Sequence, residues 1–326
     1  MLGAVALGEL AATLRAGRGL AAKRDIAAAA AQLRLSVDSA IAVGDDCAAI
    51  PDGDGYLLFS IEGFMNEFVE RDPWFAGWCG VMVNVADVAA MGGRPVAVVD
   101  AVWAADEAAA RPVFEGMRAA SDCYRVPIVG GHTNIRTDRG QLSVAILGRA
   151  KHLLTSFAAR PRDRLIAAID LRGRYREPFA NWEAATDAPA ARLCADLAVL
   201  PSLAEQKLAT AAKDISQAGL VGTAMMLAEC SRVGVRIDIA RVPKPQGVPL
   251  ARWLQTFPSY GFLIAVRPAN VPAVLARFDA RGIAAADIGE FTADHRVVMS
   301  DRQAAETLWD FTRQPLLGCV PSEAFA

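Results

Sequence analysis

Apolar and polar positions follow two periods along the chain, and the two periods alternate from segment to segment. Short apolar runs predict strands over 56–63, 95–103, 127–131, 142–150, 164–171, 213–216, 235–240 and 260–266, with short ones at 288–291 and 296–299. Helix-forming segments predict helices within the first forty residues, from residue 73 to the glycine pair at 92–93, and over 106–123, 188–200, 202–212, 217–233, 248–257 and 269–281. This alternation predicts an α/β or α+β protein.

The segment 151–163 separates two halves that both show this alternation. A length of 326 residues fits two domains of ordinary size. We therefore expect one domain of residues 1–152 and a second of residues 153–326. The chain is 53% hydrophobic and only 21% charged, so it can fill a large core, which excludes a disordered or fibrous protein.

Charge and cysteine content narrow the choice of partners and compartment. Lys and Arg total 34 against 36 Asp and Glu, a net charge of -2 without any basic run, which argues against nucleic acid. The apolar start contains Glu9 and lacks a basic segment before it, unlike a signal peptide. The longest apolar stretch, 78–93, holds two polar residues and is too short to cross a bilayer. Six scattered cysteines form no CxxC pair, so reduced thiols in the cytoplasm are expected.

Carboxylates stand at places where a carboxylate is costly without a partner. Asp45 and Asp46 are adjacent, and Glu62 ends the apolar strand LLFSIEG. Asn84 and Asp87 lie three apart on one face of a helix that is apolar nearly all round, so Asp87 must be paired or coordinated. Such oxygens suit Mg²⁺ held together with substrate phosphates. The alternatives to a metal site are a solvated turn for Asp45 and Asp46, an edge charge that reaches solvent for Glu62, and a structural polar pair for Asn84 and Asp87.

Two further segments combine glycines with polar side chains. PIVGGHTN (127–134) is read as a strand that ends in two glycines, where the backbone can approach an anion closely and His132 can contact it. KDISQAGL (213–220) joins a short strand, ending near Asp214, to the start of a helix. The alternatives are a hydrogen bond within the loop for His132 and an ordinary helix cap for the segment 213–220. The chain contains no GxxxxGK[ST] phosphate loop and no HExxH motif.

Taken in order, these segments resemble the AIR synthase (PurM) superfamily. That superfamily includes thiamine-monophosphate kinase, selenide water dikinase and the hydrogenase-maturation protein HypE. The matching segments are GDDCAAI, a strand that ends in an acid, NVADVAAMGGRP, VGGHTN and DISQAGL. The helix motif of the family reads roughly N-x-S-D-x-x-A-M-G-a-x-P, with Ala86 standing here at the Ser position. The resemblance covers about residues 20–300.

The resemblance implies a two-domain PurM-like fold. Its N-terminal domain carries a four-stranded sheet that forms a barrel with the same sheet of a second copy, and its C-terminal domain is an α/β layer. It also implies a homodimer that binds ATP and Mg²⁺ and transfers a phosphoryl group to an oxygen, or a related atom, of a small molecule. The residues implied at the metal are Asp45, Asp46, Glu62, Asp87 and Asp214. Those implied at the nucleotide are Asn84, Gly130, Gly131, Thr133 and Asp214, with Lys23 and His132 as catalytic groups.

Departures from the family pattern leave other readings open. Kinases of the superfamily usually carry Asp where Glu62 stands, GGDT in place of GGHT and DiSDG in place of DISQAG, so Gln217 replaces a carboxylate. GGHT and the segment GRGLAAK, with Lys23, are closer to selenide water dikinase, but no cysteine precedes that lysine. The chain is therefore most similar to a separate AIR-synthase-related branch. The alternatives are an ATP-binding scaffold or sensor without catalysis, and an enzyme like thiamine-monophosphate kinase or selenophosphate synthase.

Overall fold

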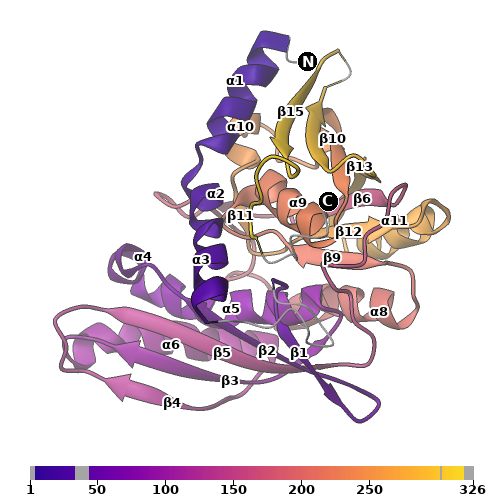
Figure 1. Cartoon of the computed structure of the whole chain (residues 1–326). Helices are drawn as coiled ribbons and strands as arrows, with labels where there is room; N and C mark the ends of the chain where they lie inside the picture. The colour runs from indigo at the N-terminus through magenta and orange to yellow at the C-terminus, as the bar shows by residue number, and fades with distance from the viewer. Residues whose placement is uncertain (1–3, 34–43, 302, 319–326) are drawn as a thin grey trace. The chain divides into compact units, whose positions relative to one another are not determined.

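The computed structural model describes residues 4–33, 44–301 and 303–318. Within these residues the chain forms two compact units (Figure 1). One, the five-stranded unit, comprises residues 46–153 and 185–205; the other, the seven-stranded unit, comprises residues 1–45, 154–184 and 206–326. The chain therefore passes between the units more than once. The division into two domains at residues 152/153 stays a prediction.

The five-stranded unit has one sheet, in the order β1-β2-β5-β3-β4. Strands β3 and β4 are parallel, and the other neighbours are antiparallel. Its strands are β1 (Ala48–Asp52), β2 (Gly55–Gly63), β3 (Arg94–Trp103), β4 (Ile128–Asn134) and β5 (Gln141–Ala150). Its helices are α4 (Asn66–Arg71), α5 (Pro73–Ala90), α6 (Glu107–Tyr124), α7 (Ala190–Leu197) and α8 (Val199–Glu205).

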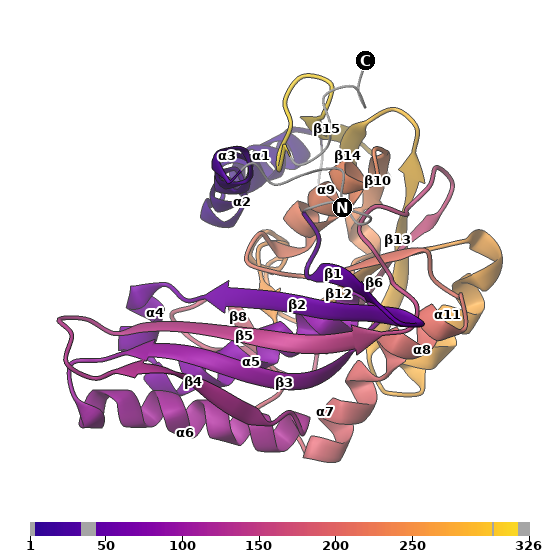
Figure 2. The same ribbon diagram turned by 60° about the horizontal axis from the view of Figure 1, so that its bottom comes forward.

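Helix α5 forms the core of this unit because its sequence is apolar on every side. It begins at Pro73, and the Asp72 carboxylate accepts a hydrogen bond from the Phe75 amide at 3.2 Å. The helix packs on β2, β3 and β5 with one side and on α6 with the other, and Figure 2 shows both helices on the same face of the sheet. The crossing with α6 is close, because a Cβ on Gly77 would lie 2.0 Å from the Val113 carbonyl oxygen.

The opposite face of this sheet is open and carries apolar side chains. Ile50, Phe59, Ile61 and Val99 lie on it, and Ile61 keeps 64% of its surface exposed. We call these four residues the open face. An apolar sheet face of this kind is typical of an interaction surface.

The seven-stranded unit has a mixed sheet in the order β15-β14-β10-β13-β6-β12-β9. The strands are β6 (Arg164–Ile169), β9 (Ala211–Asp214), β10 (Gly234–Asp238), β12 (Gly261–Val266), β13 (Ala284–Thr292), β14 (Arg296–Ser300) and β15 (Ala305–Asp310). A small sheet adds β7 (Arg174–Tyr175), β8 (Asn181–Glu183) and β11 (Phe257–Pro258). The helices are α1 (Ala4–Arg15), α2 (Arg18–Lys23), α3 (Asp25–Gln32), α9 (Gly219–Cys230), α10 (Leu250–Trp253) and α11 (Val271–Asp279), with short 3-10 turns at Ile239–Arg241 and Pro268–Asn270.

The core of this unit lies between α9, α1 and one face of the sheet. Every residue of β12 is buried, as expected for a central strand covered on both faces. Helix α9 is buried along its whole length, and its Glu229 carboxylate accepts hydrogen bonds from the Leu316 and Leu317 amides at 2.8 and 2.7 Å. Among the described residues, no helix is both long and apolar enough to cross a membrane.

The α/β fold class is confirmed, and several details of the prediction are corrected. The sheet of the five-stranded unit has five strands rather than four, because Ala48–Asp52 pairs with β2 at its edge. The helix predicted over 202–212 ends at Glu205, and residues 211–214 form β9. Pairing with β12 in the buried sheet overrides the helix preference of this alanine-rich segment.

Two more boundaries differ from the prediction, and one strand of the large sheet was not predicted. The strand expected over 127–131 continues to Asn134 because it pairs with β3 along its length. The helix expected over 248–257 is limited to 250–253, since residues 257–258 pair with β8. The strand β15, which pairs with β14, was not predicted. Of the first forty residues, 34–40 lie outside the described residues, and so does Cys319.

Candidate functional site

Asp87 occupies the buried side of α5 that faces β2. Only 4% of its surface is exposed, and the Ser60 hydroxyl donates a hydrogen bond to its Oδ2 at 2.9 Å. A buried carboxylate is costly unless it is paired, hydrogen-bonded or coordinated, so Asp87 is a candidate site residue.

Asp46 reaches the same place from the segment that leads into β1. Carboxylate oxygens of Asp46 and Asp87 lie within 4.8 Å of each other. Two carboxylates this close repel each other unless a cation or a proton lies between them. A divalent ion such as Mg²⁺ takes one or two protein carboxylates and fills its remaining positions with water and phosphate oxygens. The donor set of this pair fits that requirement.

Asn84, one helical turn before Asp87, is fully buried. Its amide nitrogen donates to the carbonyl oxygens of Gly80 and Val144, at 2.8 and 2.9 Å. Its Oδ1 has no hydrogen-bond partner among the residues that the structure describes. A buried acceptor without a donor is costly, so this oxygen is a candidate ligand contact.

A row of residues crosses the helix-covered face of the sheet next to Asn84. Glu62 of β2 and Asp100 of β3 stand on either side of Val144 of β5, and Gly131 of β4 follows Asp100. Burial raises the pKa of the Asp100 carboxyl above its usual value. A Cβ at position 131 would lie 2.7 Å from the Asp100 carboxylate, so this glycine makes room for that side chain.

Asp100 is the acidic residue that the sequence analysis missed. It has no hydrogen bond or ion pair within the described part of the chain. The signal was present, because an acid interrupts the apolar strand PVAVVDAVW on its buried side. Perturbed carboxyls of this kind concentrate at functional sites.

The segment GGHTN belongs to β4, the edge strand, and alternates between the two faces of the sheet. Gly131 and Thr133 share the face of Asp100, whereas Gly130 and His132 lie on the opposite face. The His132 ring lies beside Trp103, with 5.9 Å between ring centroids. The structure thus gathers Asp46, Glu62, Asn84 and Asp87, and separates Gly130 and His132 from them by the thickness of the sheet.

Three predicted residues belong to the seven-stranded unit. Asp214 ends β9 and is 4% exposed. Lys23 is the last residue of α2. The Asp45 carboxylate accepts hydrogen bonds from the Ser156 amide and hydroxyl, at 2.9 and 2.6 Å. The roles predicted for these residues stay predictions.

Family models match both parts of this architecture. The model described as AIR synthase related protein, N-terminal domain, matches residues 44–150. The model described as AIR synthase related protein, C-terminal domain, matches residues 181–302. The chain therefore belongs to the AIR synthase-related family, and the resemblance found in its motifs is confirmed.

Similar proteins extend over nearly the whole chain. An uncharacterized protein of Synechocystis sp., sll0787, is 46% identical over 96% of this chain and 98% of its own. The uncharacterized protein MJ0640 of Methanocaldococcus jannaschii is 35% identical, over 86% of this chain and 88% of its own. A thiamine-monophosphate kinase of Pyrococcus abyssi is 30% identical over 62% of this chain and 67% of its own.

Solved structures show the same fold at low sequence identity. Thermotoga maritima PurL complexed with ATP matches with a TM-score of 0.71 and 19% identity, over 83% of this chain. The match covers 46% of that PurL chain, so this chain spans about half of its length. AaThiL complexed with AMPPCP and TMP matches with a TM-score of 0.64 and 21% identity, over 86% of this chain and 95% of its own. The family's named relatives are thus ATP-using kinases and synthases.

Proposed function

We propose that the protein binds ATP together with Mg²⁺ and transfers the γ-phosphoryl group to an oxygen of a small molecule. The observation that supports this most is the pair formed by the partly buried Asp46 and the buried Asp87, whose carboxylate oxygens lie within 4.8 Å of each other. The pair stands in the segment that matches the N-terminal family domain. The structures of PurL with ATP and of AaThiL with AMPPCP share the fold.

Asp46 and Asp87 are the metal ligands of this proposal, with Glu62 on the neighbouring strand. For Asp45 and Asp214, which belong to the other unit, the metal role that the family resemblance implies stays a prediction. Bound Mg²⁺ neutralises charge on the phosphates and on the transferred group. The buried Oδ1 of Asn84 is free to accept a hydrogen bond from a metal-bound water or a ribose hydroxyl.

The remaining residues of the proposal position the phosphates and neutralise their charge, and they form no covalent bond with the substrate. Phosphoryl transfer depends mainly on alignment and on charge stabilisation by fixed groups. Gly131 and Thr133 offer a backbone amide and a hydroxyl to phosphate oxygens. Gly130 and His132 lie on the opposite face of the sheet. The roles that the family resemblance implies for them and for Lys23 stay predictions.

Two departures from the family pattern favour a second function, an ATP-binding scaffold without catalysis. Gln217 stands where kinases of the superfamily carry a carboxylate, and Ala86 replaces the serine of the helix motif. Release of ADP decides between the two functions. Wild-type protein incubated with Mg-ATP and small acceptors should form ADP in amounts that grow with the acceptor. Tight ATP binding without ADP from any acceptor would favour the scaffold.

We also propose a homodimer that buries the open face. An apolar sheet face of four residues, with Ile61 64% exposed, is stabilised when a second copy covers it. Sedimentation at micromolar concentration should give about twice the chain mass of 34.5 kDa. Ile61→Asp should shift the protein to monomer, because a carboxylate would be buried at the interface.

Phe114→Asp is the matched control for this dimer. Phe114 is also an exposed aromatic side chain, 37% accessible, but it lies on α6 rather than on the open face. The control should sediment as wild type does. A wild-type monomer, or an Ile61→Asp variant that still sediments as a dimer, would contradict the interface.

A further inference from the structure

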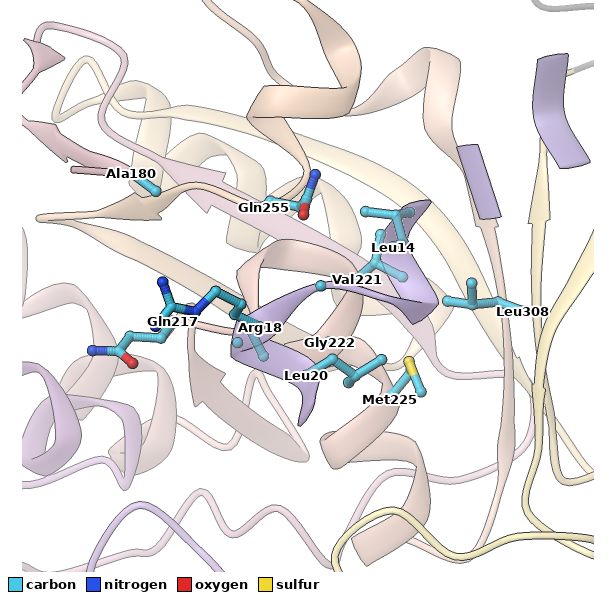
Figure 3. A pocket seen from close by; sticks show the side chains of 13 residues that line it. Leu14, Arg18, Leu20, Ala180, Gln217, Val221, Gly222, Met225, Gln255 and Leu308 are labelled. Carbon is cyan, nitrogen blue, oxygen red and sulfur yellow. The ribbon is translucent and has the colours of Figure 1, made fainter. Parts of the chain in front are cut away.

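The seven-stranded unit contains a partly open pocket beside the start of α9, with a volume of about 280 Å³. Its floor is apolar and is formed by Leu14, Leu20, Val221 and Met225. Figure 3 shows these side chains gathered on one side of the pocket, with polar side chains on the other. An apolar cavity with a few polar groups is the usual form of a small-molecule site.

Close backbone contacts hold the walls of this pocket in place. A Cβ on Gly19, in α2, would lie 2.0 Å from the Gln217 carbonyl oxygen. Gly219, at the start of α9, has φ +68, and a Cβ there would lie 2.2 Å from the Leu254 carbonyl oxygen. Three segments distant in sequence therefore meet through glycines, so the pocket exists before any ligand arrives.

The polar rim consists of Arg18, Gln217 and Gln255. Arg18 forms no ion pair or hydrogen bond within the described part of the chain, and neither does the Gln217 side chain. The Gln255 amide nitrogen donates to the Ala251 carbonyl oxygen at 2.9 Å. The rim thus presents one unpaired guanidinium and a carboxamide with free donors above an apolar floor. None of the described residues that line the pocket has an acidic side chain.

Gln217 lies in the turn that joins β9 to α9, at the polar rim of the pocket. Arg18 is the one charged side chain among the described residues that line the pocket, so the rim is positive. A positive rim favours an anionic ligand.

We propose that this pocket binds a small organic carboxylate with an apolar body of a few carbons. The guanidinium of Arg18 pairs with the carboxylate, Gln217 donates a further hydrogen bond, and the floor receives the carbon chain.

Three probes with one carbon chain test the binding. Hexanoate, hexanamide and hexylamine should be titrated into the full-length protein without ATP and followed by saturation-transfer NMR. Hexanoate should bind at least about tenfold more tightly than hexanamide, because a hydrogen bond to a charged group exceeds a neutral one by about that factor. Hexylamine should bind most weakly. Arg18→Gln should remove the preference for hexanoate.

Arg236→Gln is the matched control, since Arg236 is an exposed arginine on β10 of the same unit, outside the pocket. It should bind hexanoate as wild type does. Equal affinity for hexanoate and hexanamide, or an Arg18→Gln variant with unchanged preference, would overturn the pocket assignment. Thermal unfolding of each variant reports that the fold is intact.

Discussion

Replacement of Asp87 by asparagine is expected to abolish the Mg²⁺-dependent part of ATP binding and any turnover. Asparagine keeps the shape of the side chain and can still accept the hydrogen bond from Ser60, but it lacks the charge that holds the metal. Affinity for Mg-ATP should fall about 100-fold or more, since removal of even an outer-shell partner of a metal site costs about 10–100-fold. Calorimetric titration measures this change.

The fold of this variant should survive, and the protein without ligand should lose little thermal stability or gain some. Removal of one of two close carboxylates relieves their repulsion in the absence of a cation. Ser60→Ala is the matched control, because it removes the hydrogen bond to Asp87 and leaves both charges. If Asp87 has a structural role only, Asp87→Asn should unfold at lower temperature and still bind Mg-ATP like wild type.

Gly116→Ala in α6 should cause a large loss of stability for the addition of a single methyl group. A Cβ at this position would lie 1.9 Å from the Trp74 carbonyl oxygen of α5, a backbone atom that cannot rotate away. The two helices would have to separate, and overpacking of this kind costs about 3 kcal/mol of the free energy of unfolding. Urea denaturation of purified protein measures the loss. Because Asp87 lies on α5, affinity for Mg-ATP should fall as well.

Gly8→Ala in α1 is the control for helix propensity. Position 8 is also inside a helix, but nothing lies within 4 Å of a Cβ there. Alanine should therefore stabilise the protein by up to about 1 kcal/mol, the usual gain over glycine in a helix. A Gly116→Ala variant as stable as Gly8→Ala would show that the α5 and α6 backbones are not in contact at this point.

The sequence singles out Asp87 because its helix is apolar on nearly all sides, and the structure buries this residue near Asp46. Its role as a metal ligand stays a prediction. Asp100 escaped because a single acid in a strand looks like an ordinary exposed position. Its significance depends on strand register, which places it next to Gly131 and on the face with Glu62, and register cannot be derived from one strand alone.

The sequence mispredicts details of the fold where strand pairing in the tertiary structure outweighs the local conformational preference of a segment. The segment ATAAKD has helix-forming composition, yet residues 211–214 complete the sheet as β9. The glycines of GGHTN suggested a strand end, but pairing with β3 carries β4 on to Asn134. The pocket beside α9 was also beyond the sequence, because it is created by close contacts between segments about 200 residues apart.

One measurement tests the central claim most directly: calorimetric titration of ATP into the wild-type protein with Mg²⁺ and again with the metal removed by chelation. We predict binding with Mg²⁺ and a loss of affinity of about 100-fold or more without it, because the phosphates would then face the Asp46 and Asp87 carboxylates without a cation. Equal affinity in the two titrations would contradict the metal site and the phosphoryl-transfer function built on it.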